Sequence, residues 1–337
     1  KIDRFSFEYG VLLGVIPFCA LIGNFIWGLF SKNLKKNLLL VKIIISLESI
    51  AMLLFITISN DFVTLLISTI LFGLFNSPCF SMQDGIGSTY SKEENVPYQS
   101  IRYMGSCGYL FALIVGAGLI SLFKNNYVYI FLIALILNLI CLILWFFIKP
   151  FENVTSEEKK KVTFLETISN KTFILYFIAY VLIIGCSNVA DSYLFSRLLE
   201  ANIQEYQYSL VFASEVLLEI IVLILSTKFL KEKYYVMFLK ISVIILCLRS
   251  ILLSLNLPLT ILISFACLRG IGWGGFLSVH ILILRKIVSN KLITKAISLL
   301  TVALSLVNGL MTLFGTKIYS FLGINNFYLL LGGIQLI

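Results

Sequence analysis

Runs of about twenty consecutive apolar residues are the feature of this sequence that most restricts its fold. A helix rises about 1.5 Å per residue, so roughly twenty residues cross the hydrocarbon core of a bilayer. Strands of a membrane barrel are about ten residues long and alternate in polarity, which these runs do not. We therefore predict membrane-spanning helices at residues 9–30, 38–59, 62–84, 102–123, 127–148, 172–194, 206–227, 235–255, 258–284 and 294–321, with a shorter run from Asn326 to Ile337.

The composition agrees with a chain that lies mostly in lipid. Of its 337 residues, 59% are hydrophobic and 13% are charged, and the mean hydropathy is +1.00. Soluble domains carry about 25% charged residues. The predicted fold class is therefore an all-α integral membrane bundle, and the lipid bilayer is its first expected partner.

Lysine and arginine are distributed unevenly between the two sets of loops. Sixteen basic residues fall on one side, from Lys32 to Lys295, and five fall on the other. Basic loops remain in the cytoplasm, so we expect the polar linker 150–171 to be cytoplasmic in a multi-pass protein of the plasma (inner) membrane. The net charge of +9 is mostly this orientation signal, and no basic patch on a soluble fold is left for nucleic acid. Nucleic acid is therefore not an expected partner.

An internal echo predicts two related halves around the linker. "SKNLKK" at 31–36 and "TKFLKE" at 227–232 both place a hydroxyl residue, Lys, Leu and Lys in the same order, 196 residues apart. We predict an N-terminal half at 1–149 and a C-terminal half at 172–337. If each half is a repeat of six helices, the first half lacks its opening helix and the last helix is truncated.

This organisation resembles the major facilitator superfamily, in which two six-helix halves are joined by a cytoplasmic loop. "WGLFSKNLKK" is similar to a degraded form of the superfamily's loop signature, with Ser31 at its acid position. "YQSIRYMGSCGY" at 98–109 resembles the branch that holds lactose, nucleoside and phenylpropionate permeases. The resemblance covers the whole chain and implies a twelve-helix transporter fold, of which helices 2–6 and 7–12 are visible.

The resemblance also implies substrate-binding residues. Asp84 and Arg102 are 18 residues apart, the spacing of the acid and the arginine that hold sugar in the lactose permease. Tyr109 stands where that permease has an aromatic residue that stacks on the sugar, and Arg269 where it has a histidine. An arginine fork and a carboxylate suit a polyhydroxy or carboxylated ligand. The alternative for Asp84 and Arg102 is a solvated position near the helix ends.

Three residues of the second half are the candidate proton-coupling residues. Glu215 resembles the essential acid of the permease's eighth helix, and Arg249 resembles the arginine of its ninth. Both lie inside apolar runs at similar depth, where a charge costs about 3 kcal/mol unless it has a partner. Glu219 lies one turn from Glu215, and one of two acids beside a single arginine is expected to hold a proton. The alternative is a purely structural ion pair. The permease's second coupling acid corresponds to Gly272.

Other polar and small residues of the apolar runs receive structural interpretations. We expect Asp191 to be solvated near an outer helix end and His280 to pack near the cytoplasmic end of its helix. Glu48 lies in mid-run without an obvious partner. Close helix packing is predicted at the glycines of "RGIGWGGF" (269–276) and at the column of Gly108, Ala112 and Gly116.

Enzyme chemistry has little support in this sequence. The chain has one histidine, no HExxH or GxSxG motif and no phosphate-binding loop, and its seven cysteines form no CxxC pair. We therefore expect no enzyme, no cofactor and no metal site.

The predicted function is that of a monomeric secondary active transporter working by alternating access. We expect it to take up a small polar organic solute, of the sugar, nucleoside or aromatic acid class, together with protons. One alternative is an efflux antiporter of amphipathic compounds, and another is a non-transporting membrane sensor on the same fold.

Overall fold

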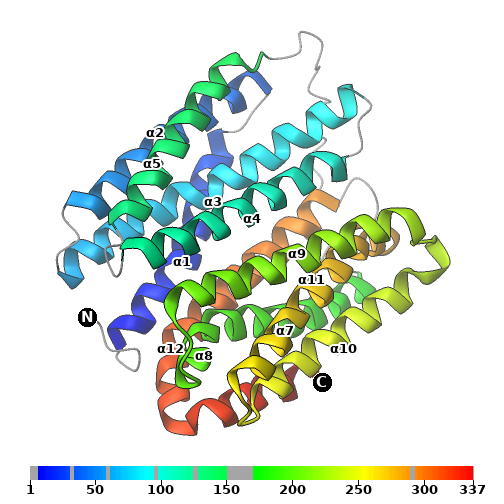
Figure 1. The fold of residues 1–337 in the computed structure, drawn as a ribbon. Helices are drawn as coiled ribbons and strands as arrows, with labels where there is room; N and C mark the ends of the chain where they lie inside the picture. Colours follow the sequence, from blue (N-terminus) through cyan, green and yellow to red (C-terminus); the bar gives the residue numbers. More distant parts are fainter. Residues whose placement is uncertain are drawn as a thin grey trace.

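The computed structural model describes residues 7–30, 34–57, 61–94, 98–123, 128–149, 170–288 and 293–336. This part of the chain is helical without strands, which confirms the predicted all-α class (Figure 1). Ten helices in it are long and apolar enough to cross a membrane. The elements are α1 (Phe7–Phe30), α2 (Leu34–Thr57), α3 (Phe62–Glu93), α4 (Tyr98–Phe123), α5 (Val128–Phe147), α7 (Lys171–Ser192), α8 (Leu194–Glu200), α9 (Glu205–Phe229), the short 3₁₀ helix η1 (Glu232–Tyr234), α10 (Tyr235–Leu253), α11 (Leu259–Ile287) and α12 (Ile293–Leu336).

Local sequence signals set several helix boundaries. Asp61 caps α3, because its Oδ1 accepts a hydrogen bond of 2.8 Å from the backbone N–H of Thr64. Asn170 caps α7 in the same way. Gly323 interrupts α12 with a φ of 73°, a left-handed value that glycine adopts without a steric penalty. The apolar run that begins near Asn326 is therefore a separate helical segment.

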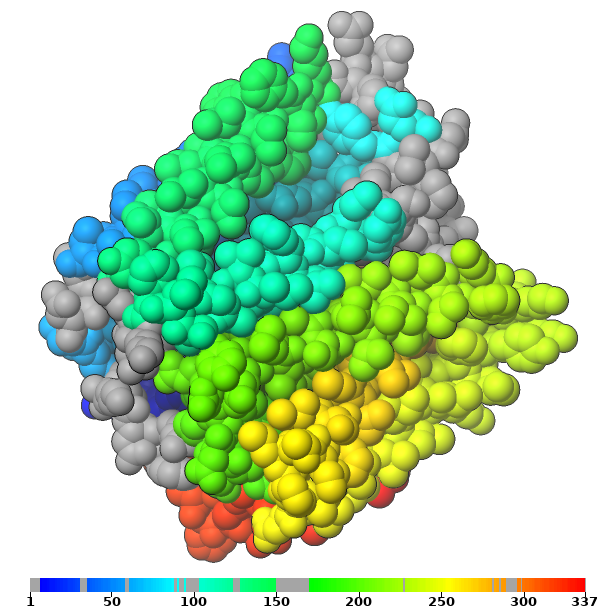
Figure 2. Space-filling view, in the orientation of Figure 1, coloured from blue at the N-terminus to red at the C-terminus, as the bar shows by residue number. Residues whose placement is uncertain are grey.

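The helices form two groups, α1–α5 and α7–α12 (Figure 1). The main contacts between the groups are those of α1 with α12 and of α4 with α9, and Figure 2 shows α4 lying along α9. Within the second group, α10 and α9 both pack against α11, and α7 packs against α12. We call the end of the bundle where α5 ends and α7 begins the linker end. Most of residues 150–171, the predicted linker, lie outside the described residues.

Arg197, which the loop count places at the end opposite the linker, has a structural role. This side chain of α8 is buried, and its Nε donates to the carbonyl oxygen of Leu253 at 2.8 Å. Its Nη2 donates to the carbonyl oxygen of Leu255 at 2.6 Å. The guanidinium thus satisfies carbonyls at the end of α10 and fastens α8 across the end of the second group.

The two glycine patterns behave differently. On α11, a Cβ added to Gly270 would overlap the carbonyl oxygen of Glu215, and one added to Gly272 would lie 2.8 Å from Leu246 Cγ. The expected close packing of α11 is therefore confirmed. On α4, an added Cβ at Gly108 or Gly116 meets no described atom within 4 Å, so the predicted packing of that column is wrong. These positions face open space, while α4 contacts α9 through other residues.

Gly270→Ala is expected to destabilise the protein strongly. The new methyl group would meet the backbone of α9 rather than a movable side chain, and overpacking of this kind costs about 1–3 kcal/mol or more. The expected result is a lower midpoint of thermal unfolding for the purified protein in detergent. Gly116→Ala is the matched control, because it adds the same methyl group in open space. Equal midpoints for the two variants would contradict the close approach of α11 to α9.

Candidate functional site

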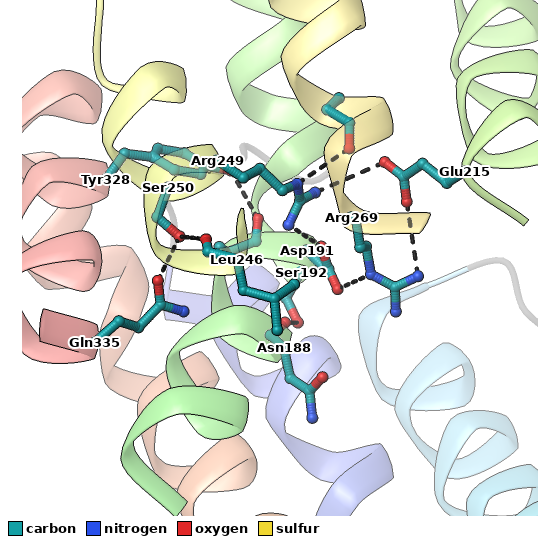
Figure 3. A network of polar contacts seen from close by, with 12 residues as sticks. Asn188, Asp191, Ser192, Glu215, Leu246, Arg249, Ser250, Arg269, Tyr328 and Gln335 are labelled. Carbon is teal, nitrogen blue, oxygen red and sulfur yellow. Dashed lines mark hydrogen bonds and ion pairs between the residues drawn. The ribbon is translucent and has the colours of Figure 1, made fainter. Parts of the chain in front are cut away.

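Four charged side chains from four helices meet inside the second group (Figure 3). They are Asp191 on α7, Glu215 on α9, Arg249 on α10 and Arg269 on α11, and we call them the charge cluster. Arg249 Nη1 lies 2.7 Å from Asp191 Oδ1, and Arg249 Nη2 lies 3.7 Å from Glu215 Oε1. Arg269 Nη1 lies 3.7 Å from Glu215 Oε2, and Arg269 Nε donates a hydrogen bond to Asp191 Oδ2. Each acid thus lies between the two arginines.

The charge cluster is electrically balanced and almost entirely buried. Glu215 and Arg249 are fully buried, whereas the side chains of Asp191 and Arg269 are 12% and 19% exposed. Two guanidinium groups and two carboxylates cancel, which reduces the cost of burying four charges in a membrane protein. The two partly exposed members show that the cluster reaches a surface at the Asp191–Arg269 side. A solute is therefore expected to approach from that side.

Glu215 is held less tightly than Asp191. Both Glu215 oxygens are buried, form no hydrogen bond with the described residues and approach the arginines no closer than 3.7 Å. Asp191 has one ion-pair contact of 2.7 Å and accepts a hydrogen bond from Arg269. Arg249 is also fixed by a hydrogen bond of 3.1 Å from its Nε to the carbonyl oxygen of Ala266. Protonation of Glu215 would therefore break no hydrogen bond, whereas protonation of Asp191 would weaken two close contacts.

An aromatic column on α11 connects the charge cluster with the linker end. The Arg269 guanidinium lies 6.0 Å from the ring centre of Trp273, and Trp273, Phe276 and His280 stack in sequence. Tyr176 and Tyr180 of α7 stack on His280, and Tyr176 Oη lies 2.5 Å from His280 Nδ1. His280 is thus a buried packing residue, in agreement with its structural interpretation, and these rings fill the space between α7 and α11.

The structure brings most of the predicted second-half residues together. Glu215 and Arg249 are in contact, and Arg269, predicted as a substrate residue, belongs to the same cluster. Tyr109 on α4 is 52% exposed and lies within electrostatic range of Arg269 and Glu215. Glu219, one turn from Glu215, interacts electrostatically with Glu215 and Arg269. A second acid in contact with Arg249 is Asp191, whose Oδ1 lies 2.7 Å from Arg249 Nη1.

Asp84 and Arg102 lie near the ends of the two apolar spans, Phe62–Gly87 and Tyr103–Phe123, as expected. α3 continues for nine residues beyond Asp84, which is exposed, and Arg102 is the fifth residue of α4. The side chain of Arg102 lies outside the described part of the structure. The predicted clamp formed by these two residues therefore stays a prediction.

Asp191 is the functional candidate that sequence reasoning missed. It was expected to be solvated, yet it lies between two arginines and is mostly buried. The helix end beside it is no boundary with water, because Tyr193, Leu194 and Leu198 are buried directly after it. Charge balance was the available signal, since Arg249 and Arg269 require two acids.

Comparisons with known proteins identify relatives of this fold. A family model described as "MFS_1 like family" matches residues 5–329. The crystal structure of the nucleoside transporter NupG is similar, with a TM-score of 0.77, 13% identity, and coverage of 100% of this chain and 89% of that chain. A structure of a NupG mutant is similar with the same TM-score and identity, over 98% of this chain and 88% of that chain. No curated protein matches by sequence. At this identity the structural likeness shows the fold alone.

Proposed function

We propose that the chain, which belongs to the MFS_1 like family and is therefore a secondary transporter, couples the uptake of a small polar organic solute to protons. The family and the fold confirm the resemblance to the major facilitator superfamily and make the chain a multi-pass integral membrane transporter. The solute class and the coupling ion are parts of the proposal. The proposal also includes the location in the plasma membrane with the linker in the cytoplasm, the two halves at 1–149 and 172–337, and the monomeric state.

The observation that carries the proposal is the loose attachment of Glu215 inside a balanced charge cluster. When Glu215 binds a proton, the cluster changes from two acids and two arginines to one acid and two arginines. Arg269, which is partly exposed, then has a surplus positive charge and free donors. A carboxylate or a hydroxyl-rich solute can accept those donors and restore the balance. Proton and solute thus favour each other's binding, which is the requirement for symport.

The proposed solute site lies between Arg269 and the first group of helices. Tyr109 of α4 has an exposed ring and lies in the electrostatic range of Arg269, so it is placed to cover one face of a bound solute. Asp84 and Arg102 are proposed as the clamp on the side of the first group. Glu219 is proposed to share the proton with Glu215, with Arg249 holding the cluster in place. A sugar, a nucleoside or an aromatic acid suits this set, and the similarity to a nucleoside transporter favours testing nucleosides first.

The test is transport of labelled solutes into right-side-out membrane vesicles with an imposed pH gradient. Vesicles with acid outside are expected to accumulate one solute class from a panel of nucleosides, sugars and aromatic acids. Accumulation driven only by the reversed gradient would indicate proton–solute antiport, that is, efflux. Absence of any transport across a broad panel, with the protein verified as folded, would favour the non-transporting sensor.

Arg102→Lys is expected to weaken solute binding although the charge is kept. Lysine cannot supply the two parallel donors of a guanidinium, and loss of one charged hydrogen bond of about 1.4 kcal/mol corresponds to a tenfold change in affinity. The measurement is the apparent affinity for uptake, with Lys228→Arg, an exposed position on α9, as the control. Normal transport by Arg102→Ala at normal expression would remove Arg102 from the proposed site.

A further inference from the structure

A second buried acid, Glu48, lies in the first group of helices, apart from the charge cluster. It is 4% exposed and is enclosed by α2, α3 and α5. Asn76 Nδ2 of α3 donates a hydrogen bond of 2.7 Å to Glu48 Oε1. Asn138 of α5 lies within hydrogen-bonding range of the same carboxyl group, and its Nδ2 also reaches Ser49 Oγ at 3.2 Å. The acid is therefore surrounded by amide and hydroxyl groups.

Glu48 has no positive partner in the ranges that the structure describes. The titratable and polar groups that face it are amides and thiols, namely Asn76 and Cys79 of α3 and Asn138 and Cys141 of α5. Lys42 lies nearly two turns away on the same helix, with its Nζ 4.6 Å from the ring centre of Phe146. Asp191 and Glu215 each have two arginines, whereas no described lysine or arginine forms an ion pair with Glu48. An isolated carboxylate in such surroundings is very costly.

A proton neutralises this carboxylate better than a metal ion does. Asn138 Nδ2 lies 3.4 Å from the carbonyl oxygen of Ile45. A carbonyl oxygen can only accept a hydrogen bond, so the NH2 group of Asn138, and not its oxygen, faces α2. Asn76 likewise directs its nitrogen toward Glu48. Hard cations require converging oxygens, and these two amides present N–H donors instead. The N–H donors of both amides also favour the ionised form, so the case for a proton rests on the burial of Glu48 and on the lack of a positive partner among the described residues.

The same position is also occupied by a buried charge in the second group. "SLESI" at 46–50 parallels "CLRSI" at 247–251, which aligns Glu48 with Arg249. The serine after each residue bonds to an amide side chain of a later helix. Ser49 Oγ accepts from Asn138, and Ser250 Oγ donates to Gln335 Oε1 at 2.9 Å. The second group therefore pairs its charged residue with acids, whereas in the first group no basic side chain that the structure describes forms an ion pair with the acid.

We propose that Glu48 is a proton-binding site of the first group of helices, occupied by a proton near neutral pH. The proton makes the carboxyl neutral, so α2, α3 and α5 remain packed around it without a counter-ion. Entry of water between these helices would release the proton. The site is separate from Glu215, and its existence does not depend on the transport mechanism proposed above.

Infrared spectroscopy of the purified full chain in lipid nanodiscs tests this assignment. A protonated carboxyl group gives a carbonyl stretching band that carboxylates lack and that shifts in heavy water. Near neutral pH, we expect Glu48→Gln to remove one such band and Glu48→Asp to move it. Glu94→Gln, at an exposed position after α3, is the control and should change nothing in this region. Any band of Glu215 is assigned separately with Glu215→Gln.

Two results would overturn the proposal. The first is a wild-type spectrum in which Glu48→Gln removes no acid band, since Glu48 would then be ionised. The second result applies if the Glu48 variants do not fold. Wild-type protein with isotope-labelled glutamate should still show a protonated glutamate band that persists in Glu215→Gln, and its absence would show that Glu48 holds no proton.

Discussion

Glu215→Gln is expected to abolish proton-driven accumulation of solute while exchange of solute across the membrane remains measurable. Glutamine has the shape of protonated glutamate but never binds or releases a proton. The variant therefore keeps Arg269 in the state with surplus positive charge, which is the proposed solute-binding state. Solute still crosses in both directions, but the pH gradient no longer drives net movement. The measurement is uptake into vesicles with and without an imposed pH gradient, together with exchange of labelled for unlabelled solute.

Glu232→Gln is the control for this experiment. Glu232 is exposed and forms an ion pair of 2.8 Å with Lys286 at the linker end, beyond the end of α9, the helix that carries Glu215. We expect its replacement to leave accumulation unchanged. If Glu215→Gln still concentrates solute in response to the gradient, Glu215 is not the proton carrier. Glu219, Asp191 and Glu48 would then be tested in turn, and failure of all of them would place the coupling ion itself in doubt.

Hydropathy predicted the fold well because lipid imposes one requirement on every spanning segment, namely a long apolar helix. Hydropathy did not predict the parts of helices that continue outside the lipid. The extension of α3 beyond Asp84 has the polar sequence "GIGSTYSKE", and it is held by tertiary contacts such as the buried Ile86 and the hydrogen bond from Tyr90 to the carbonyl oxygen of Lys149. The short helix α8 was missed for the same reason.

The candidate site was only partly predictable from the sequence. Counting depth along antiparallel helices correctly indicated that Glu215 and Arg249 meet, because depth follows directly from the helical rise. It misplaced Asp191, because the end of an apolar run was equated with water while α8 covers it. The glycine columns show a similar limit. Small residues permit a close approach on both α4 and α11, but the sequence does not say which surface has a neighbour.

Asp191→Asn and Arg249→Gln are each expected to destabilise the protein severely, and the double variant is expected to recover part of the loss. Either single change leaves a buried charge without its close partner at 2.7 Å, and breaking a buried pair costs about 3–5 kcal/mol. The double variant leaves Glu215 and Arg269 as a balanced pair. Interaction energies between contacting residues are about 0.5–3 kcal/mol, so the double variant should be less destabilised than the sum of the singles by an amount in this range.

Thermal unfolding of the purified variants measures this coupling, and transport assays separate it from proton coupling. Asp191 is held by close contacts and Glu215 by long ones, so substitutions of the two acids are expected to impair the protein in different ways. Variants of Asp191 should lose stability first. Transport per folded molecule should be higher in the double variant than in Asp191→Asn. Variants of Glu215 should fold and lose only uphill accumulation. Additive unfolding energies in the cycle would show that Asp191 and Arg249 do not stabilise each other, and the assignment of a structural acid beside a titrating acid would then be wrong.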